Sequence, residues 1–88
     1  MRRAAKVDAN QGAVVAALRA AGCSVQCLHA VGGGVPDLLV SRSLPFGRAD
    51  TWLLEVKDGA KPPSERRLTP RQKEWHREWR GRVFTVTN

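Results

Sequence analysis

Apolar residues in the stretch 8–21 recur at intervals of three and four, which is the spacing of one face of a helix. Asp8 is the expected N-cap of this helix and Gly22 its expected C-cap. Gln11 lies on the same row as the apolar residues, so we expect its side chain to face the sheet. The pattern predicts one amphipathic helix near the start of the chain.

Shorter apolar runs after this helix predict three strands. Residues 24–31 alternate apolar and polar side chains, residues 38–40 form a continuous apolar run, and residues 51–57 alternate again. The stretch 41–50 contains a proline and a glycine and is typical of a hairpin loop. Residues 38–40 and 51–57 are therefore expected to pair as a hairpin.

A second helix is predicted to begin at Thr69, because a proline occupies the first helical position and Gln72 the capping-box position. We expect it to continue to about Arg80 and to end at Gly81. Residues 82–87 are the last predicted strand, which returns parallel to its neighbour after a right-handed crossover. The whole order predicts an α/β fold: a mixed sheet flanked by two helices.

Composition and charge narrow the function. The 88 residues indicate one domain, 1–88, and a net charge of +7 with a pI near 10.8 indicates an anionic partner, for which nucleic acid is our expectation. A membrane surface is the weaker alternative, because the positive charge is spread over several segments and no apolar run approaches the roughly 20 residues that cross a bilayer. Residues 1–7 are predicted to form a basic arm that either contacts a phosphate backbone or is solvated. This arm lacks the apolar core of a secretory signal, so we expect an intracellular, cytoplasmic protein.

Cysteine and histidine offer little chemistry. Cys23 and Cys27 with His29 would make half of a zinc site, but no second Cys or His pair stands at ligand spacing. We therefore expect reduced cysteines that pack. His29 is a candidate general base by residue type, and a structural or exposed histidine is the alternative.

Charged side chains on the strand 51–57 supply the candidate chemistry. Strand residues alternate between two faces, so Leu53, Glu55 and Lys57 share one face. Hairpin pairing would bring Asp37 to the same end of the sheet as Glu55. Two carboxylates beside an ammonium suit an oxygen-ligated divalent cation such as Mg²⁺, and such a cation lets carboxylates lie beside a phosphate in a basic protein.

Other segments predict contact with nucleic acid. The glycine triplet 32–34 permits backbone angles closed to other residues and lets a phosphate backbone approach, although a plain flexible turn is the alternative. The stretch 58–68 has two adjacent prolines and no apolar period, so it is predicted to be an exposed loop that either guides phosphate or is a solvated linker. The residues expected to contact nucleic acid are Gly33, Gly34, Lys61, Arg66, Arg67 and Arg71.

Four pieces of the chain carry a family resemblance. They are Gly34-Val35-Pro36-Asp37, Glu55-Val56-Lys57 and Leu68-Thr69-Pro70-Arg71-Gln72, preceded by a helix that contains Asn10-Gln11. Their order and spacing, over nearly the whole chain, resemble the PD-(D/E)XK nuclease superfamily and specifically its virus-type replication-repair nuclease (VRR-NUC) branch. The resemblance implies a restriction-endonuclease-like αβββαβ core.

The resemblance also implies roles for individual residues. Asp37, Glu55 and the carbonyl of Val56 would hold one or two Mg²⁺ or Mn²⁺ ions. Lys57 would orient the attacking water or stabilise the transition state. These residues would together hydrolyse phosphodiester bonds and leave 5′-phosphate and 3′-hydroxyl ends.

Each of two glutamines has two alternative roles in that scheme. The family often places a glutamate on the first helix, where this chain has Asp8, Asn10 and Gln11. Gln11 would bind a metal through a water, or it is a capping or surface amide. Gln72 would point into the site, and its capping duty is an equally good explanation.

The resemblance implies a homodimeric, structure-specific endonuclease of a phage-type replication, recombination or repair system, acting on branched DNA such as four-way junctions. A non-catalytic DNA-binding module is the main alternative, and indifference to divalent metal would distinguish it. The pair Trp75 and Trp79, four residues apart, is expected to pack on the sheet, with base stacking as the alternative. A third possibility is that these tryptophans form a protein-interaction surface.

Overall fold

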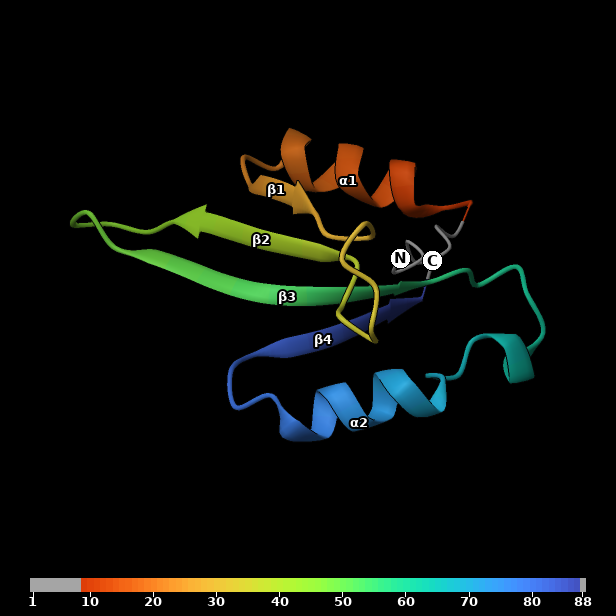
Figure 1. Ribbon diagram of the computed structural model, residues 1–88. Coiled ribbons are helices and arrows are strands. Elements are labelled where there is room, and N and C mark those ends of the chain that lie inside the picture. Colours follow the sequence, from red (N-terminus) through yellow and green to blue (C-terminus); the bar gives the residue numbers. More distant parts are fainter. Residues whose placement is uncertain (1–8, 88) are drawn as a thin grey trace.

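Figure 1 shows the computed structural model, in which residues 9–87 are described. The predicted basic arm 1–7 and the predicted N-cap Asp8 lie outside the described residues. The elements agree in number and order with the sequence pattern, apart from one added 3-10 turn. They are α1 (Gln11–Ala20), β1 (Ser24–Cys27), β2 (Leu38–Ser43), β3 (Ala49–Lys57), the 3-10 turn η1 (Pro63–Glu65), α2 (Pro70–Glu78) and β4 (Val83–Thr87).

The four strands form one mixed sheet in the order β1-β2-β3-β4. The pairs β1–β2 and β2–β3 are antiparallel, whereas β4 lies parallel to β3 after the crossover through α2. The two helices lie on opposite sides of the sheet (Figure 1). This confirms the predicted α/β class, the mixed sheet and the two flanking helices. Within residues 9–87, no helix has the length and apolar character needed to span a bilayer.

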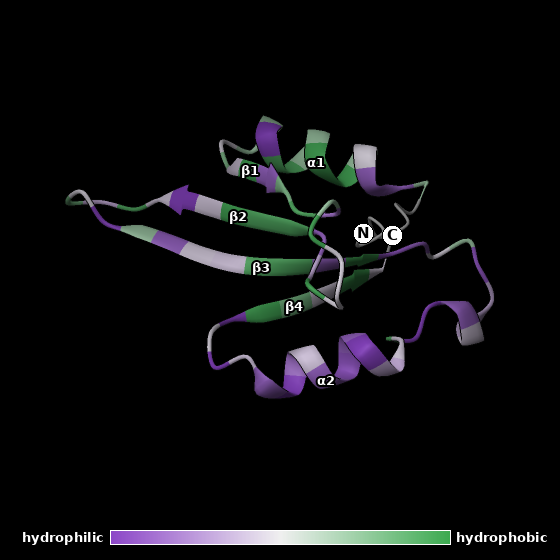
Figure 2. Cartoon of the chain, in the orientation of Figure 1, coloured by the Kyte–Doolittle hydropathy of each residue, from purple (hydrophilic) through white to green (hydrophobic). Residues whose placement is uncertain are grey.

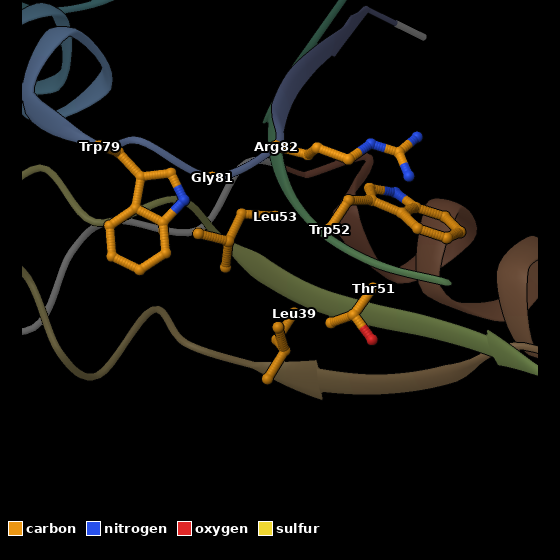
Figure 3. Close-up of a pocket in the computed structure, with 7 residues that line it drawn as sticks. All are labelled: Leu39, Thr51, Trp52, Leu53, Trp79, Gly81 and Arg82. Atoms are coloured by element: carbon orange, nitrogen blue, oxygen red, sulfur yellow. The ribbon is translucent and has the colours of Figure 1, made fainter. Parts of the chain in front are cut away.

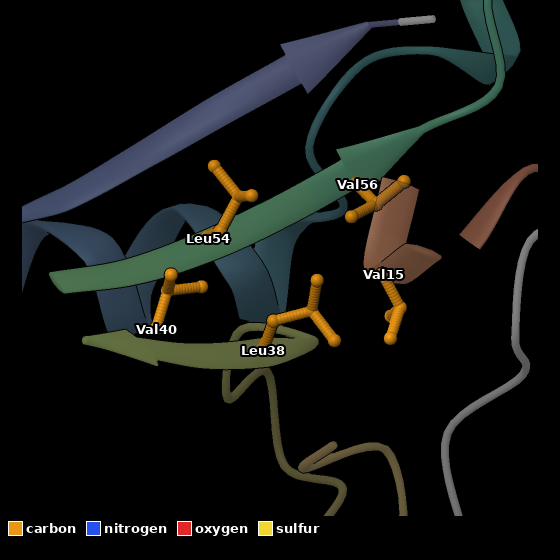
Figure 4. Close-up of a cluster of buried hydrophobic side chains, with 5 residues drawn as sticks. All are labelled: Val15, Leu38, Val40, Leu54 and Val56. Atoms are coloured by element: carbon orange, nitrogen blue, oxygen red, sulfur yellow. The ribbon is translucent and has the colours of Figure 1, made fainter. Parts of the chain in front are cut away.

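The apolar core lies between α1 and the sheet. Val15 of α1 packs against Leu38 and Val40 of β2 and against Leu54 and Val56 of β3, as Figure 4 shows. Alternate residues of a strand point to opposite faces, so the neighbours of Leu54 and Val56 on β3 point away from this core. The predicted facing of the third strand is confirmed, and its charged side is turned toward α2.

Several element boundaries predicted from the sequence are wrong. The first strand ends at Cys27 rather than at residue 31, because the amide of Val31 donates to the carbonyl of Leu28 and closes a turn that contains His29. The first helix begins at Gln11, with Asn10 in the N-cap position. The second helix ends at Glu78, two residues before the predicted end, because Trp79 is already extended.

The hairpin between β2 and β3 is longer than predicted. The ladder continues through Ser43 and Ala49, which reduces the connecting loop to residues 44–48. Backbone pairing needs no apolar side chains, and Ser41 and Thr51 add a side-chain hydrogen bond of 2.9 Å across the two strands. A polar stretch that resembles a loop in sequence is therefore strand in the structure.

The helix α2 differs from α1 in how it is held. Figure 2 shows α2 as almost entirely hydrophilic, and none of the residues Pro70–Glu78 is buried. Its start is well defined: the Thr69 hydroxyl accepts from the Gln72 amide, and the Gln72 side chain accepts from the Thr69 amide, which confirms the predicted capping box. Polar contacts, rather than an apolar stripe, must therefore attach this helix to the sheet.

Gly34 gives a test of the packing between the glycine turn and α2. Its φ is +86°, and a Cβ there would lie 2.6 Å from the carbonyl oxygen of Arg71. We expect Gly34→Ala to lower the free energy of unfolding by about 2 kcal/mol, because positive φ and a backbone contact both oppose a side chain. Urea denaturation measures this change.

Gly12→Ala is the matched control. Gly12 lies in α1, and no other group stands within 4 Å of the position that a Cβ would take there. Alanine at this position should raise the free energy of unfolding by about 0.5–1 kcal/mol through helix propensity. Equal effects of the two substitutions would contradict the packing of the glycine turn on α2.

Candidate active site

The sheet register brings the two predicted carboxylates together. Leu38 pairs with Leu54 in the antiparallel ladder, so the residue before Leu38 stands across from the residue after Leu54. These are Asp37 and Glu55, with exposed fractions of 8% and 2%. The amide of Val56 donates a 2.7 Å hydrogen bond to Oδ2 of Asp37, which fixes the aspartate beside the middle of the Glu55-Val56-Lys57 segment.

Gln72 joins this strand to helix α2. Nζ of Lys57, which is only 7% exposed, donates to Oε1 of Gln72 at 2.8 Å. Nε2 of the same glutamine donates to Oε2 of Glu55 at 3.4 Å, and its Oε1 also accepts from the amide of Thr69 at 2.9 Å. The two roles expected as alternatives for Gln72 are combined in one side chain, which caps the helix and contacts both charged residues.

The start of α1 reaches the same end of β3. Nδ2 of Asn10 donates to the carbonyl of Lys57 at 3.1 Å, so the side chain in the N-cap position bonds the sheet instead of its own helix. Gln11 is buried, as expected from its place on the apolar row. The oxygens Oδ1 of Asn10 and Oε1 of Gln11 are buried and have no hydrogen-bond donor within residues 9–87.

His76 lies at this site and the sequence reasoning missed it. Its Nε2 lies 3.8 Å from Oε1 of Glu55, too far for a hydrogen bond. Burial, and secondarily the positive charge of Lys57, lower the pKa of His76 below its ordinary value of 6.5, so the imidazole is neutral at pH 7 and the contact is not an ion pair. His76 follows Gln72 by four residues, which is about one helical turn. That spacing in the sequence could have predicted that both side chains lie on the same face of the helix.

The donor set suits a small, hard cation. No group of three or more His, Cys, Asp or Glu side chains in residues 9–87 is placed to hold a metal ion. Mg²⁺ does not require one, because it is commonly held by one or two carboxylates and keeps several waters. Asp37 and Glu55 offer carboxylate oxygens, and Asn10, whose Nδ2 donates to the Lys57 carbonyl, adds a buried amide oxygen that can accept from a water.

The residues predicted to contact nucleic acid fall into two groups. Gly33 and Arg71 line one shallow hollow of about 280 Å³, whose rim also carries Glu74 and Glu78. Gly34 was expected to let a phosphate backbone approach. In the structure, the backbone of Arg71 is what lies close to it. The other three lie on the connection between β3 and α2, which extends beyond the end of the sheet in Figure 1: Lys61 and Arg66 are half-buried and Arg67 is exposed.

The remaining candidates are placed as follows. Cys23 and Cys27 are free thiols that pack against the edge of the core. Trp75 and Trp79 stack on each other, with ring centroids 4.8 Å apart and planes inclined by 18°. Trp79 also borders a pocket with Leu53, on the face of β3 that carries the charged residues.

No protein-family model, curated protein or solved structure matches the chain. The family resemblance noted in the sequence therefore stays a prediction. Support for a function comes from the contacts of the site itself: two carboxylates, one ammonium and the glutamine between them.

Gln72 should be the residue that attaches α2. We expect Gln72→Ala to lower the free energy of unfolding by about 2 kcal/mol, because it leaves the buried Lys57 without this acceptor and removes half of the capping box. Lys73→Ala, an exposed change on the same helix, should stay within about 0.5 kcal/mol of the native protein. Urea denaturation and amide exchange of α2 measure both variants, and equal protection would contradict the attachment.

The lowered pKa of His76 predicts a pH dependence of stability. The unfolded chain takes up a proton on this residue near pH 6.5, whereas the folded chain resists it, so the folded state loses stability as pH falls from about 6.5 through the lowered pKa. Above that window the residue is neutral in both states and costs no stability. The free energy of unfolding in EDTA should therefore fall more between pH 7 and 5 in the native protein than in His76→Gln, and parallel curves would contradict a depressed pKa.

Proposed function

We propose that this protein is a metal-dependent nuclease that hydrolyses phosphodiester bonds in DNA. The observation that supports it most is the convergence of Asp37, Glu55 and Lys57 on one end of the sheet, where all three are nearly buried. Gln72 joins Glu55 to Lys57, and the Val56 amide holds Asp37 beside them. Burying charged groups is costly unless they serve a purpose or are fully paired. Buried titratable groups gathered in this way are typical of a catalytic site.

The charge of the chain supports a polyanionic substrate. The net charge is +7, so the protein as a whole attracts phosphate, yet the site presents two carboxylates that repel it. A divalent cation between the carboxylates and the phosphate reverses that local repulsion. A phosphodiester substrate and a metal cofactor therefore explain both features together.

Asp37, Glu55 and the carbonyl of Val56 are the groups that would hold Mg²⁺ or Mn²⁺. When bound, such an ion lowers the pKa of a water and neutralises charge on the phosphate. Lys57 donates one hydrogen bond to Gln72, and its ammonium has two further protons to donate to a phosphate oxygen or a water. Gln72 holds Lys57 and Glu55 in position, and Gln11 would accept from a water at the site.

The substrate and assembly follow from the family resemblance. A restriction-endonuclease-like core agrees with the order of helices and strands, and the VRR-NUC resemblance favours a homodimer that cuts branched DNA for phage-type recombination or repair. The basic residues Arg66, Arg67 and Arg71 would contact the phosphate backbone beside the site. Fold alone does not assign a function, so the charged cluster remains the main support.

The test is cleavage of labelled duplex, single-stranded, flap and four-way-junction DNA with Mg²⁺, Mn²⁺ or EDTA. The native protein should cut only with a metal. The near-isosteric variants Asp37→Asn, Glu55→Gln and Lys57→Met should each lose about 100-fold or more in rate, because each removes a group that stabilises the transition state. Circular dichroism confirms that each variant is folded.

Lys73→Ala is the matched control, because it removes one exposed positive charge from α2 without touching the site. It should change affinity slightly and leave the rate at saturating DNA unaltered. The native protein and all three variants could instead bind DNA with the same affinity, with or without Mg²⁺, and cut none of it. That result would identify a non-catalytic DNA-binding module. Cleavage that persists in all three variants would come from another enzyme.

A further inference from the structure

A pocket of about 330 Å³ opens on the sheet face that carries the charged cluster. Figure 3 shows the Trp79 indole beside Leu53, with Leu39 on the neighbouring strand. Leu39 and Leu53 are cross-strand partners, so both side chains point to the same face. The lining is mainly apolar, and Leu39 and Trp79 remain 37% and 46% exposed, which is high for residues of their size in a small domain.

The wall formed by Trp79 is shaped by its neighbours. One side of the indole stacks on Trp75, yet nearly half of the residue stays accessible. A Cβ on Gly81 would lie 2.7 Å from Nε1 of Trp79, so only glycine allows the ring edge to lie against the chain there. An oriented aromatic ring at the mouth of an apolar pocket is a surface on which a planar group can stack.

The pocket adjoins the proposed catalytic groups. Leu53 lies two residues before Glu55 on the same face of β3, a distance of about 7 Å along the strand. That distance is comparable to the span from a phosphate through its sugar to its base. The far wall comes from the segment after α2, the helix whose Gln72 contacts both Glu55 and Lys57.

Charge reaches this pocket from the chain as a whole, whose net charge is +7. Arg82 also lines the pocket, but its guanidinium bonds Asp50 and lies over the ring of Phe84. Phe84 pairs with Leu54, so this guanidinium lies on the opposite face of the sheet from Leu53, beside Trp52 in Figure 3. An apolar slot with an exposed indole, in a basic protein, combines the two features of single-strand recognition, base stacking and attraction of the phosphate backbone.

We propose that this pocket takes one unpaired nucleobase of the strand whose phosphate lies at Asp37 and Glu55. The inference rests on the proposed nuclease function and defines its substrate class. A base in an intact duplex is stacked and paired, whereas one at a flap, junction or bulge is already free, so it enters the pocket without the cost of unstacking. Cleavage is therefore directed to phosphates beside an unpaired nucleotide.

The experiment compares two duplexes that carry the same central bulge, one with a normal nucleotide and one with an abasic nucleotide. Affinities are measured in EDTA, where no cutting occurs. The native protein should bind the base-containing bulge about tenfold more tightly, the effect of one base stacked on an aromatic ring. Trp79→Ala and Leu39→Ser should each reduce this ratio to below about threefold.

Phe46→Ala is the control, because Phe46 is an almost fully exposed aromatic residue in the loop between β2 and β3. It should keep the tenfold ratio. Equal affinity of the native protein for the two bulges, or an unchanged ratio in both pocket variants, would overturn the inference. The inference would also be overturned if the two pocket variants lost a dimer while the tenfold affinity ratio stayed intact. The pocket would then be an interface between copies of the chain.

The same DNAs with Mg²⁺ separate this inference from the proposed function. We expect cuts at the phosphates next to the base-containing bulge, and fewer cuts in Trp79→Ala. If the protein cuts both DNAs without any preference for the base, the base-binding inference is overturned and the proposed nuclease function stands. If the protein prefers the base-containing bulge in EDTA but does not cleave with any metal, the base-binding inference stands and the proposed nuclease function is overturned.

Discussion

The buried charges of β3 are the constraint on which the other features depend. Glu55 and Lys57 point away from the apolar core and are nevertheless almost fully buried, so each needs hydrogen-bonding partners. For the proposed chemistry, these partners must also leave the two groups charged. The amide of Gln72 meets this need, because it donates to the carboxylate, accepts from the ammonium and neutralises neither. The proposed chemistry uses the charges preserved in this way.

The same contact explains the division of the molecule into two unlike sides. The helix α1 is held by Val15 against an apolar core, whereas α2 is polar and is held by the hydrogen bonds of Gln72. A rigid apolar side positions β3. The polar side carries the groups that would meet the substrate, which is consistent with functional residues lying where packing is weakest.

The candidate site and the pocket share one face of the sheet, because a strand repeats its facing every second residue. Leu53, Glu55 and Lys57 follow one another along β3, from an apolar slot to a charged end. Asp37 and Asn10 then come from distant parts of the chain to that charged end, one accepting from the Val56 amide and the other donating to the Lys57 carbonyl. The proposed base recognition and the proposed chemistry would therefore share one strand face.

Local patterns in the sequence determined the elements and much of the site. The alternation of β3 predicted which face holds Glu55 and Lys57, and the Thr69 and Gln72 capping box predicted the start of α2, because both depend only on near neighbours. Only the tertiary structure decided that Asn10 bonds β3, that His76 lies against Glu55, and that the polar ends of the hairpin continue as strand. Those features depend on groups far apart in the chain, whose meeting is set by sheet register and helix placement, and no local period encodes such contacts.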